Sequence, residues 1–389
     1  ADQTALIAAR AIELMHEAGI PKNVVQLLPG SGVSVGAPLT SDARIAGVCF
    51  TGSTATAQRI NKVMAQSVAP DAPLVAETGG LNAMIVDSTA LPEQVVRDVL
   101  ASSFQSAGQR CSALRMLYVQ KDIAEHLLEM LFGAMDELRL GNPWLLSTDV
   151  GPVIDQAAKA KIDQHCAVFK AQGRVLKALP VPAEGLFVAP TVIKLDGIEQ
   201  LEEEIFGPVL HVATFEADQL DQVVDSINAQ GYGLTFGLHT RVDTRVEQII
   251  KRVKVGNLYV NRNQIGAIVG SQPFGGEGLS GTGPKAGGPQ YVKRFLKPAQ
   301  SSPVVSDVQA SVTATQLQAA IDQLQPGRWA TSTQRNAALK ACGLDNGQRD
   351  LVAASPEAMP GPTGELNMLS TYARGVVLCL GPDFDTAKA

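Results

Sequence analysis

The sequence Leu74-Val75-Ala76-Glu77-Thr78-Gly79-Gly80 joins a short apolar strand to a carboxylate and a flexible pair of glycines. A second strand is predicted just after it, at residues 83–86, and a helix at residues 91–104. Before it, a strand at residues 44–50 leads into a helix that ends near Val68. Strands that alternate with helices at such short spacing predict a parallel sheet with crossover helices, so the fold class is α/β.

The other elements are predicted from hydrophobic periodicity and from glycine and proline. We expect further helices and strands as follows: helices at residues 4–19, 123–138 and 315–325, and strands at residues 24–28, 114–119 and 376–380. Residues 33–39 are predicted to be a loop, and residues 356–364 a turn-rich break. Residues 264–290 are unusually rich in glycine, and a loop of that length usually has a function.

The composition is that of an ordinary globular α/β protein, long enough at 389 residues for two or three domains. The formal net charge is −6 and no block of Lys and Arg occurs, so we expect no nucleic-acid surface. No run of about 18 apolar residues occurs, so we expect no membrane span. The five cysteines are scattered without a CxxC pair and indicate a reducing cytoplasm. The five histidines lack ligand spacing, so we expect no metal site.

Cys111 lies in Gln109-Arg110-Cys111-Ser112, between polar neighbours. Arg110 and a nearby helix or loop terminus could supply the positive potential that activates a thiol. A buried, inert cysteine is the commoner outcome, and it fits Cys49 and Cys379 with their apolar neighbours. Cys166 follows His165 directly, but adjacent helical residues point in different directions, so we reject a Cys–His dyad there.

Three other motifs each allow two interpretations. Glu77 is either a turn or helix cap or a base that activates water. Phe50-Thr51-Gly52-Ser53-Thr54 is either a plain capped helix, with Ser53 or Thr54 as N-cap, or a helix N-terminus that binds phosphate. Residues 202–204 are an acidic run that is usually solvated, although Glu204 could hold ribose hydroxyls and Phe206 pack on a flat ring.

Taken in order, these motifs resemble the aldehyde dehydrogenase superfamily over roughly residues 1–298. The matching motifs are residues 50–54, 77–80, 108–112, 204–208 and Pro273-Phe274-Gly275-Gly276. The Gln-Arg-Cys-Ser sequence, with residues 266–270 before Pro273, is similar to the glutamate semialdehyde (pyrroline-5-carboxylate) dehydrogenase branch. Residues 275–289 and 361–365 resemble bifunctional bacterial flavoenzymes of proline catabolism within that branch.

The resemblance implies roles for individual residues. Cys111 would attack the aldehyde, its backbone N–H would donate to the oxyanion, and Glu77 would activate the hydrolytic water. NAD would be the cofactor, bound by Gly52, Ser53, Thr78, Gly79, Glu204 and Phe206. The substrate carboxylate would be bound by Ser112, Gly266, Ala267 and Phe274.

The resemblance also implies an organisation into four parts. Residues 1–80 would be the C-terminal part of an incomplete Rossmann-type NAD domain, and residues 81–270 an α/β catalytic domain. Residues 271–305 would complete the anchor loop and form an oligomerisation flap, and residues 306–389 would belong to a C-terminal α/β domain. We expect a homo-oligomer, and FAD only on a separate proline dehydrogenase domain upstream.

One departure from the family pattern concerns the start of the chain. The family's NAD fold, its oxyanion asparagine and its ribose-binding lysine would precede Ala1. We therefore expect residues 1–389 alone to be inactive. Two alternatives to the glutamate semialdehyde reaction stay open: another semialdehyde, such as that of succinate, and a non-catalytic structural segment.

Overall fold

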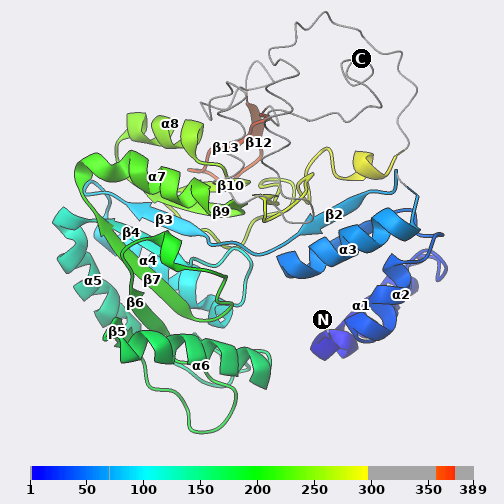
Figure 1. Cartoon of the computed structure of the whole chain (residues 1–389), viewed down its shortest axis with the longest axis horizontal. Coiled ribbons are helices and arrows are strands. Elements are labelled where there is room, and N and C mark those ends of the chain that lie inside the picture. The colour runs from blue at the N-terminus through cyan, green and yellow to red at the C-terminus, as the bar shows by residue number, and fades with distance from the viewer. Residues whose placement is uncertain (1, 70, 297–355, 373–389) are drawn as a thin grey trace, which may run out of the picture.

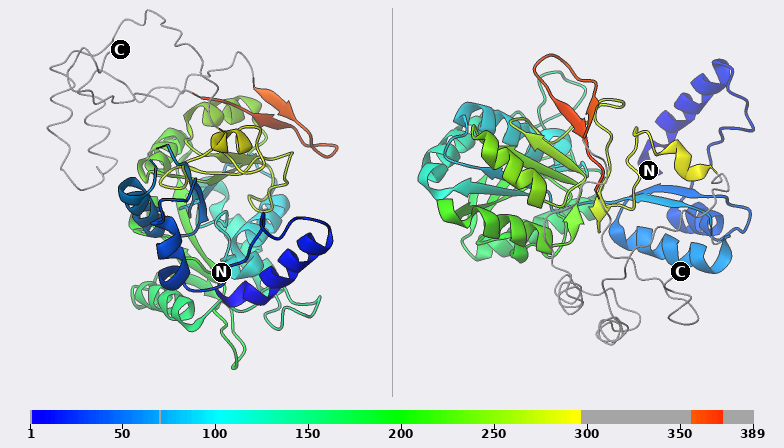
Figure 2. Two further views of the ribbon diagram at one scale, coloured as in Figure 1. Left: turned by 90° about the vertical axis from the view of Figure 1, so that its right-hand side faces the viewer. Right: turned by 90° about the horizontal axis from the view of Figure 1, so that it is seen from above.

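A computed structural model describes residues 2–69, 71–296 and 356–372, and all structural statements concern these residues. They form two units, a large one around a seven-stranded sheet and a small one around a two-stranded sheet. Strand β2 (Leu74–Glu77) belongs to the small sheet and strand β3 (Ala83–Val86) to the large one. Figure 2 shows the two units side by side, so residues 78–82 cross from one to the other.

The large sheet has the strand order β10-β9-β3-β4-β7-β6-β5. All its neighbouring strands pair in parallel except β5 and β6, which pair antiparallel. The bounds of the remaining strands are β4 Met116–Gln120, β5 Val175–Ala178, β6 Thr191–Lys194, β7 Val209–Phe215, β9 Thr235–His239 and β10 Asn257–Val260. The prediction of a parallel α/β sheet is confirmed.

Helices cover both faces of this sheet (Figure 1). Helices α4 and α5 pack against each other on one face, α7 and α8 lie on the other, and α6 lies beside β5 and β6. Their bounds are α4 Pro92–Phe104, α5 Lys121–Asp136, α6 Gln156–Ala171, α7 Leu220–Ala229 and α8 Asp243–Arg252. Because helices cover both faces, β3 and β4 are buried along their whole length.

The small unit consists of β1 (Val48–Thr51) paired in parallel with β2, together with three helices. These are α1 Ala5–Glu17, α2 Ala37–Thr40 and α3 Thr54–Ser67. Cys49 in β1 is exposed, 3.4 Å from the hydroxyl of Tyr291, so the expectation of a buried cysteine is wrong. Alternation along the strand turns Cys49 outward, while Val48 and Phe50 are half-buried.

Two local predictions in the small unit are also wrong. Residues 24–28 form no strand, because no described strand pairs with them and Val24 is 68% exposed. Residues 33–39 are helical rather than a loop. A π-helical turn, Gly32–Gly36, runs directly into α2 and is capped by reciprocal hydrogen bonds between Ser31 and Ser34.

Among the described residues, two short antiparallel strand pairs lie outside the two main sheets. The turn-rich break at residues 356–364 includes the first strand of a hairpin, β12 (Glu357–Met359), paired antiparallel with β13 (Asn367–Leu369). A second short pair joins β8 (Tyr232–Gly233) to β11 (Glu277–Gly278). The expected helix at 315–325, the expected strand at 376–380 and Cys379 lie outside the described residues.

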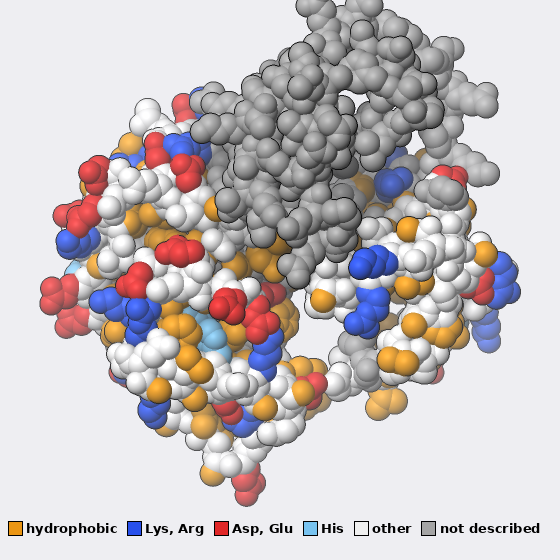
Figure 3. Space-filling view, viewed as in Figure 1, with side chains coloured by type: hydrophobic (Ala, Val, Ile, Leu, Met, Phe, Trp, Pro, Cys, Tyr) orange, Lys and Arg blue, Asp and Glu red, His pale blue; other side chains and the backbone are white. Residues whose placement is uncertain are grey.

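Acidic and basic side chains are interspersed over the face of the large unit in Figure 3. None of the helices in the described ranges is long and apolar enough to span a membrane.

The buried strands allow a test of the packing. Leu117 in β4 is fully buried, so Leu117→Ala is expected to lower the free energy of unfolding by about 2–5 kcal/mol. Leu145, which is 58% exposed in a loop, is the matched control, and Leu145→Ala is expected to change it by less than about 0.5 kcal/mol. Urea unfolding of both variants measures the difference. Equal losses would contradict the assignment of β4 to the core.

Candidate active site

The loop that carries Cys111 begins in a left-handed turn after α4. Ser106, Ala107 and Gly108 all have positive φ, of 56°, 53° and 65°. Asn82, directly before β3, then fixes the loop: its amide nitrogen donates to the carbonyl of Cys111 at 2.6 Å and to that of Ala113 at 2.9 Å. The Asn82 side chain, just before β3, therefore fixes the position of the backbone that carries the thiol.

Burial dominates the environment of the Cys111 thiol. Burial and the carboxylates of Glu204 and Glu77 raise its pKa, and hydrogen bonds from the backbone N–H groups of Ser112 and Cys111 partly offset this. The Arg110 guanidinium is turned away and donates to the Ser106 hydroxyl at 3.2 Å. Arg110 is not among the groups that shift the pKa of the thiol, so the structure gives no support to the expectation that Arg110 activates it.

The Glu77 carboxylate lies at the end of β2, against the glycine-rich loop. One oxygen, Oε2, accepts from the backbone N–H of Gly276 at 2.7 Å. The other, Oε1, is buried and has no hydrogen-bond partner among the described residues. Burial raises the pKa of Glu77 to about 7, although the Gly276 bond and Lys285 oppose the rise. A half-ionised carboxylate at neutral pH is suited to take a proton from water.

Glycines make room for this carboxylate. A Cβ on Gly275 would lie 2.9 Å from Glu77 Oε1, and one on Gly281 would lie 2.8 Å from Oε2. Lys285 belongs to the same loop, and its ammonium donates to the carbonyl of Gly256. Burial lowers the pKa of Lys285 to about 8, while Glu277 and Glu77 oppose the fall.

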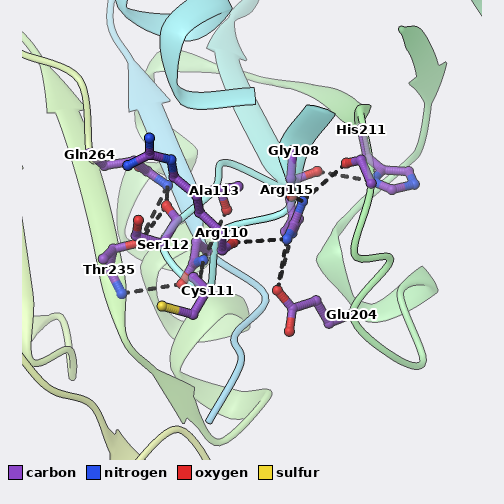
Figure 4. A network of polar contacts seen from close by, with 12 residues as sticks. Gly108, Arg110, Cys111, Ser112, Ala113, Arg115, Glu204, His211, Thr235 and Gln264 are labelled. Atoms are coloured by element: carbon purple, nitrogen blue, oxygen red, sulfur yellow. Dashed lines mark hydrogen bonds and ion pairs between the residues drawn. The ribbon is translucent and has the colours of Figure 1, made fainter. Parts of the chain in front are cut away.

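The Glu204 carboxylate faces the cysteine loop across a buried arginine (Figure 4). Its Oε1 accepts from Arg115 Nη2 at 2.9 Å and from Nε at 3.3 Å. A Cβ on Gly79 would lie 1.7 Å from Glu204 Oε2, so Gly79 allows the carboxylate to approach the backbone. The Phe206 ring is 44% exposed, and the Arg115 guanidinium lies 5.3 Å from its centroid.

The other residues expected to bind the cofactor lie in or next to the small unit. The Ser53 side chain accepts from the Thr56 N–H and caps α3, as expected. Gly52 precedes it, where a Cβ would lie 2.4 Å from the Phe50 ring. The Thr78 hydroxyl donates to the carbonyl of Leu279 at 2.6 Å and so binds the end of β2 to the glycine-rich loop.

The residues expected to bind the substrate fall into two groups. Ser112 is buried, and its carbonyl accepts from the Thr235 hydroxyl and the Gln264 amide at 3.2 and 3.3 Å. Gly266 has a φ of 75° and begins the anchor loop together with Ala267. Phe274, at the end of that loop, is half-buried and exchanges two backbone hydrogen bonds with Ala286.

The sequence interpretation missed four residues of this site: Asn82, Arg115, Gln264 and Lys285. Arg115 had a readable signal, because a charged residue interrupts the apolar run from Ala113 to Val119. Asn82 and Gln264 act by bonding the backbone of distant loops, which the sequence alone does not reveal.

The rejected Cys166–His165 dyad is also absent from the structure. His165 Nε2 instead lies 2.9 Å from His211 Nε2, and burial raises the pKa of Cys166 to about 11. Within the described ranges, no group of three or more His, Cys, Asp and Glu side chains could hold a metal ion.

The close approach of two backbone segments beside Glu77 can be tested. A Cβ on Gly256 would lie 1.7 Å from the carbonyl oxygen of Gly275, so Gly256→Ala is expected to destabilise the fold by about 1–3 kcal/mol. Gly133, inside helix α5 with open space around it, is the matched control. Gly133→Ala is expected to stabilise the fold by about 0.5–1 kcal/mol. Chemical denaturation measures both, and a neutral Gly256→Ala would contradict the geometry.

Comparison with known proteins places the chain in a family. The model of the aldehyde dehydrogenase family matches residues 1–300. The bifunctional protein PutA of Escherichia coli K12 is 51% identical over 401 residues, which covers 98% of this chain and 30% of that protein. The 1-pyrroline-5-carboxylate dehydrogenase of Bacillus cereus is 37% identical, with 78% of this chain and 59% of that protein covered.

A solved structure agrees with these matches. The 1-pyrroline-5-carboxylate dehydrogenase from Thermus, solved with bound NAD, has a TM-score of 0.72 and 35% identity, covering 76% of this chain and 58% of that one. The chain thus spans about a third of the length of the PutA relatives and somewhat over half of the shorter dehydrogenases. With its fold and more than three quarters of its length matched, the chain belongs to the aldehyde dehydrogenase family.

Proposed function

We propose that this chain carries the catalytic part of an NAD-dependent dehydrogenase that oxidises L-glutamate γ-semialdehyde to L-glutamate in proline catabolism. The observation that carries the proposal is the pairing of a half-buried thiol with a half-buried carboxylate whose pKa is about 7. The similarity to PutA and to 1-pyrroline-5-carboxylate dehydrogenases supports this choice of substrate.

Cys111 is the proposed nucleophile. Its sulfur attacks the aldehyde carbon to form a thiohemiacetal, and loss of a hydride from that carbon leaves a thioester on the sulfur. The Cys111 backbone N–H is the proposed donor to the oxygen that becomes negative during attack. Asn82 keeps that backbone in place through its bond to the Cys111 carbonyl.

Glu77 is the proposed general base of the second step. Its Oε1 has no hydrogen-bond partner among the described residues and can therefore accept a proton from water. The hydroxide equivalent attacks the thioester carbon, and the thiol leaves as the acid is released. The Gly276 N–H, bonded to the other oxygen, holds the carboxylate in orientation.

The residues present fit NAD, which would accept the hydride at its nicotinamide ring. The half-exposed Phe206 ring offers a flat apolar surface beside the Glu204 carboxylate, which suits a nicotinamide and its ribose. The N-terminus of α3, opened by Ser53 after Gly52, suits the pyrophosphate. Thr78 and Gly79 are proposed to contact the cofactor where the chain crosses between the units.

The anchor loop is proposed to bind the substrate carboxylate. The backbone N–H groups of Gly266 and Ala267 donate no hydrogen bond among the described residues, and small side chains leave space beside them. Ser112 and Phe274 are the proposed neighbours of that end of the substrate.

We further propose the four-part organisation given by the resemblance, with residues 1–80 in the NAD domain and residues 81–270 in the catalytic domain. Residues 271–305 would form the anchor end and oligomerisation flap, and residues 306–389 part of a C-terminal domain. The proposal includes a homo-oligomer in the cytoplasm and an upstream proline dehydrogenase domain that carries FAD.

Substitution of the two reacting groups tests the mechanism in the full-length protein. Cys111→Ser is expected to abolish NADH formation, because an alcohol is a far weaker nucleophile than a thiol. Glu77→Gln is expected to lower kcat about 10²–10⁴-fold while the first turnover still releases NADH, because only thioester hydrolysis needs the base. Cys49→Ser, at an exposed thiol, is the control and is expected to keep normal turnover. Full activity in Cys111→Ser would contradict the enzyme function.

The pH dependence follows from the raised pKa of Glu77. Only the ionised carboxylate accepts a proton, so the hydrolysis rate is expected to rise with pH through a midpoint near pH 7. Single-turnover hydrolysis measured from pH 5 to pH 9 checks this. A midpoint near 4.5, the value of an unperturbed glutamate, would show that Glu77 is not buried as described.

A substrate panel separates the alternatives. NADH formation is measured with the semialdehydes of glutamate and succinate, which differ by one carbon atom and the α-amino group that it carries. The expected result is a higher kcat/KM for glutamate semialdehyde. Preference for succinate semialdehyde would keep the family and change the substrate.

A further inference from the structure

Arg115 is the largest fully buried side chain in the described part of the chain, and no step of the proposed mechanism uses it. It lies between the end of the cysteine loop and the first residue of β4. All five of its N–H donors are directed at acceptors (Figure 4).

Two segments far apart in sequence supply these acceptors. From the cysteine loop, the carbonyl of Gly108 accepts from Nη1 at 2.7 Å and that of Arg110 from Nη2 at 3.1 Å. From the motif at residues 204–208, the carbonyl of Gly207 accepts from Nη1 at 3.1 Å, and Glu204 Oε1 accepts from Nε and Nη2. The guanidinium thus bonds both segments at once.

The backbones of the two segments also touch directly. A Cβ on Gly108 would lie 2.1 Å from the carbonyl oxygen of Gly207, which leaves no space for movement of one loop alone. The Phe206 ring also contacts Arg115, whose guanidinium lies 5.3 Å from the ring centroid. A shift of the cysteine loop would therefore shift both proposed nicotinamide contacts, Glu204 and Phe206.

The backbone of Arg115 is held as firmly as its side chain. Its carbonyl accepts from the His211 backbone N–H and from His211 Nδ1, both at 2.9 Å. Since Nδ1 donates, His211 Nε2 must accept from His165 Nε2. Burial lowers the pKa of His211 to about 3, so the pair stays in this neutral arrangement at physiological pH.

We infer that Arg115 is a positioning residue that locks the nucleophile loop to the cofactor motif and neutralises the Glu204 carboxylate beside Cys111. The inference rests on the proposed function for its kinetic consequences, whereas its effect on the thiol is independent of turnover. Four charged or titratable groups act on the thiol from different elements: Glu204, Glu77 from β2, Arg115 before β4, and Tyr259 from β10.

The kinetic test uses Arg115→Lys in the full-length protein. An ammonium has three donors on one nitrogen and cannot fill a five-donor planar arrangement. We expect kcat to fall at least about tenfold and KM for NAD to rise, with KM for the aldehyde unchanged within about threefold. Arg174→Lys is the control, since the Arg174 side chain donates to Gln200 and Asp196 at the surface, and it is expected to behave as wild type. Normal kcat in Arg115→Lys would overturn the inference.

The charge is tested by alkylation of Cys111 with iodoacetamide, followed by mass spectrometry across a range of pH. Glu204→Gln removes a negative charge, so the midpoint of alkylation is expected to move to lower pH. Glu203→Gln, at the adjacent exposed carboxylate, is the control and is expected to leave it unchanged. An unshifted midpoint in Glu204→Gln overturns the inference even if no Arg115 variant folds.

The double variant separates position from charge. Arg115→Met is expected to raise the alkylation midpoint, because Glu204 loses its counter-charge. Adding Glu204→Gln is expected to bring the midpoint back down but to leave kcat low, since three backbone carbonyls still lack their donor. Recovery of kcat to the level of Glu204→Gln alone would mean that Arg115 acts only through charge, and would overturn the positioning role.

These readouts separate the two proposals. If Cys111→Ser forms no NADH while Arg115→Lys has normal kcat, the positioning role fails and the proposed function stands. If Cys111→Ser is fully active, the proposed function fails, and the alkylation midpoints still decide the role of Arg115.

Discussion

The burial of one guanidinium group is the constraint on which the rest of the site depends. Arg115 is fully buried, so its charge is stable only while every donor has an acceptor. Four carbonyl or carboxylate groups meet this need, and they belong to the cysteine loop and to the motif at Glu204. Because removing one partner of a buried charge typically costs about 3–5 kcal/mol, the two segments have little freedom to separate.

A second constraint concerns space rather than charge. Glu77 is the last residue of β2, directly before the chain passes from the small sheet to the large one, and the glycine-rich loop folds over it. At Gly275 and Gly281 any side chain would meet the carboxylate, so only glycine lets the loop cover it. This cover removes water, and the loss of solvation is what brings the pKa of Glu77 to about 7. The close cover of Glu77 by the loop therefore explains both why the loop needs glycine at these positions and why the pKa of Glu77 is raised.

Much of the fold could be predicted because its elements carry local signals. Strands β3 and β4 are short apolar runs, and α4 begins with a proline, so their positions were predicted to within two residues. The failures come from contacts that sequence does not display. Val24 to Leu28 has the residues of a strand but no described partner, and Cys49 has apolar neighbours yet lies on the outward side of β1.

The sequence by itself determined the α/β class, the family and the candidates Cys111 and Glu77, because ordered motifs and apolar periodicity are local properties. Only the tertiary structure decided how these groups behave. Arg110, next to the cysteine, bonds the Ser106 hydroxyl, while Arg115, four residues away, bonds the Glu204 carboxylate and the cysteine loop. The physical reason is that pKa values and loop positions depend on burial and on hydrogen bonds between distant segments, and folding alone brings those segments together.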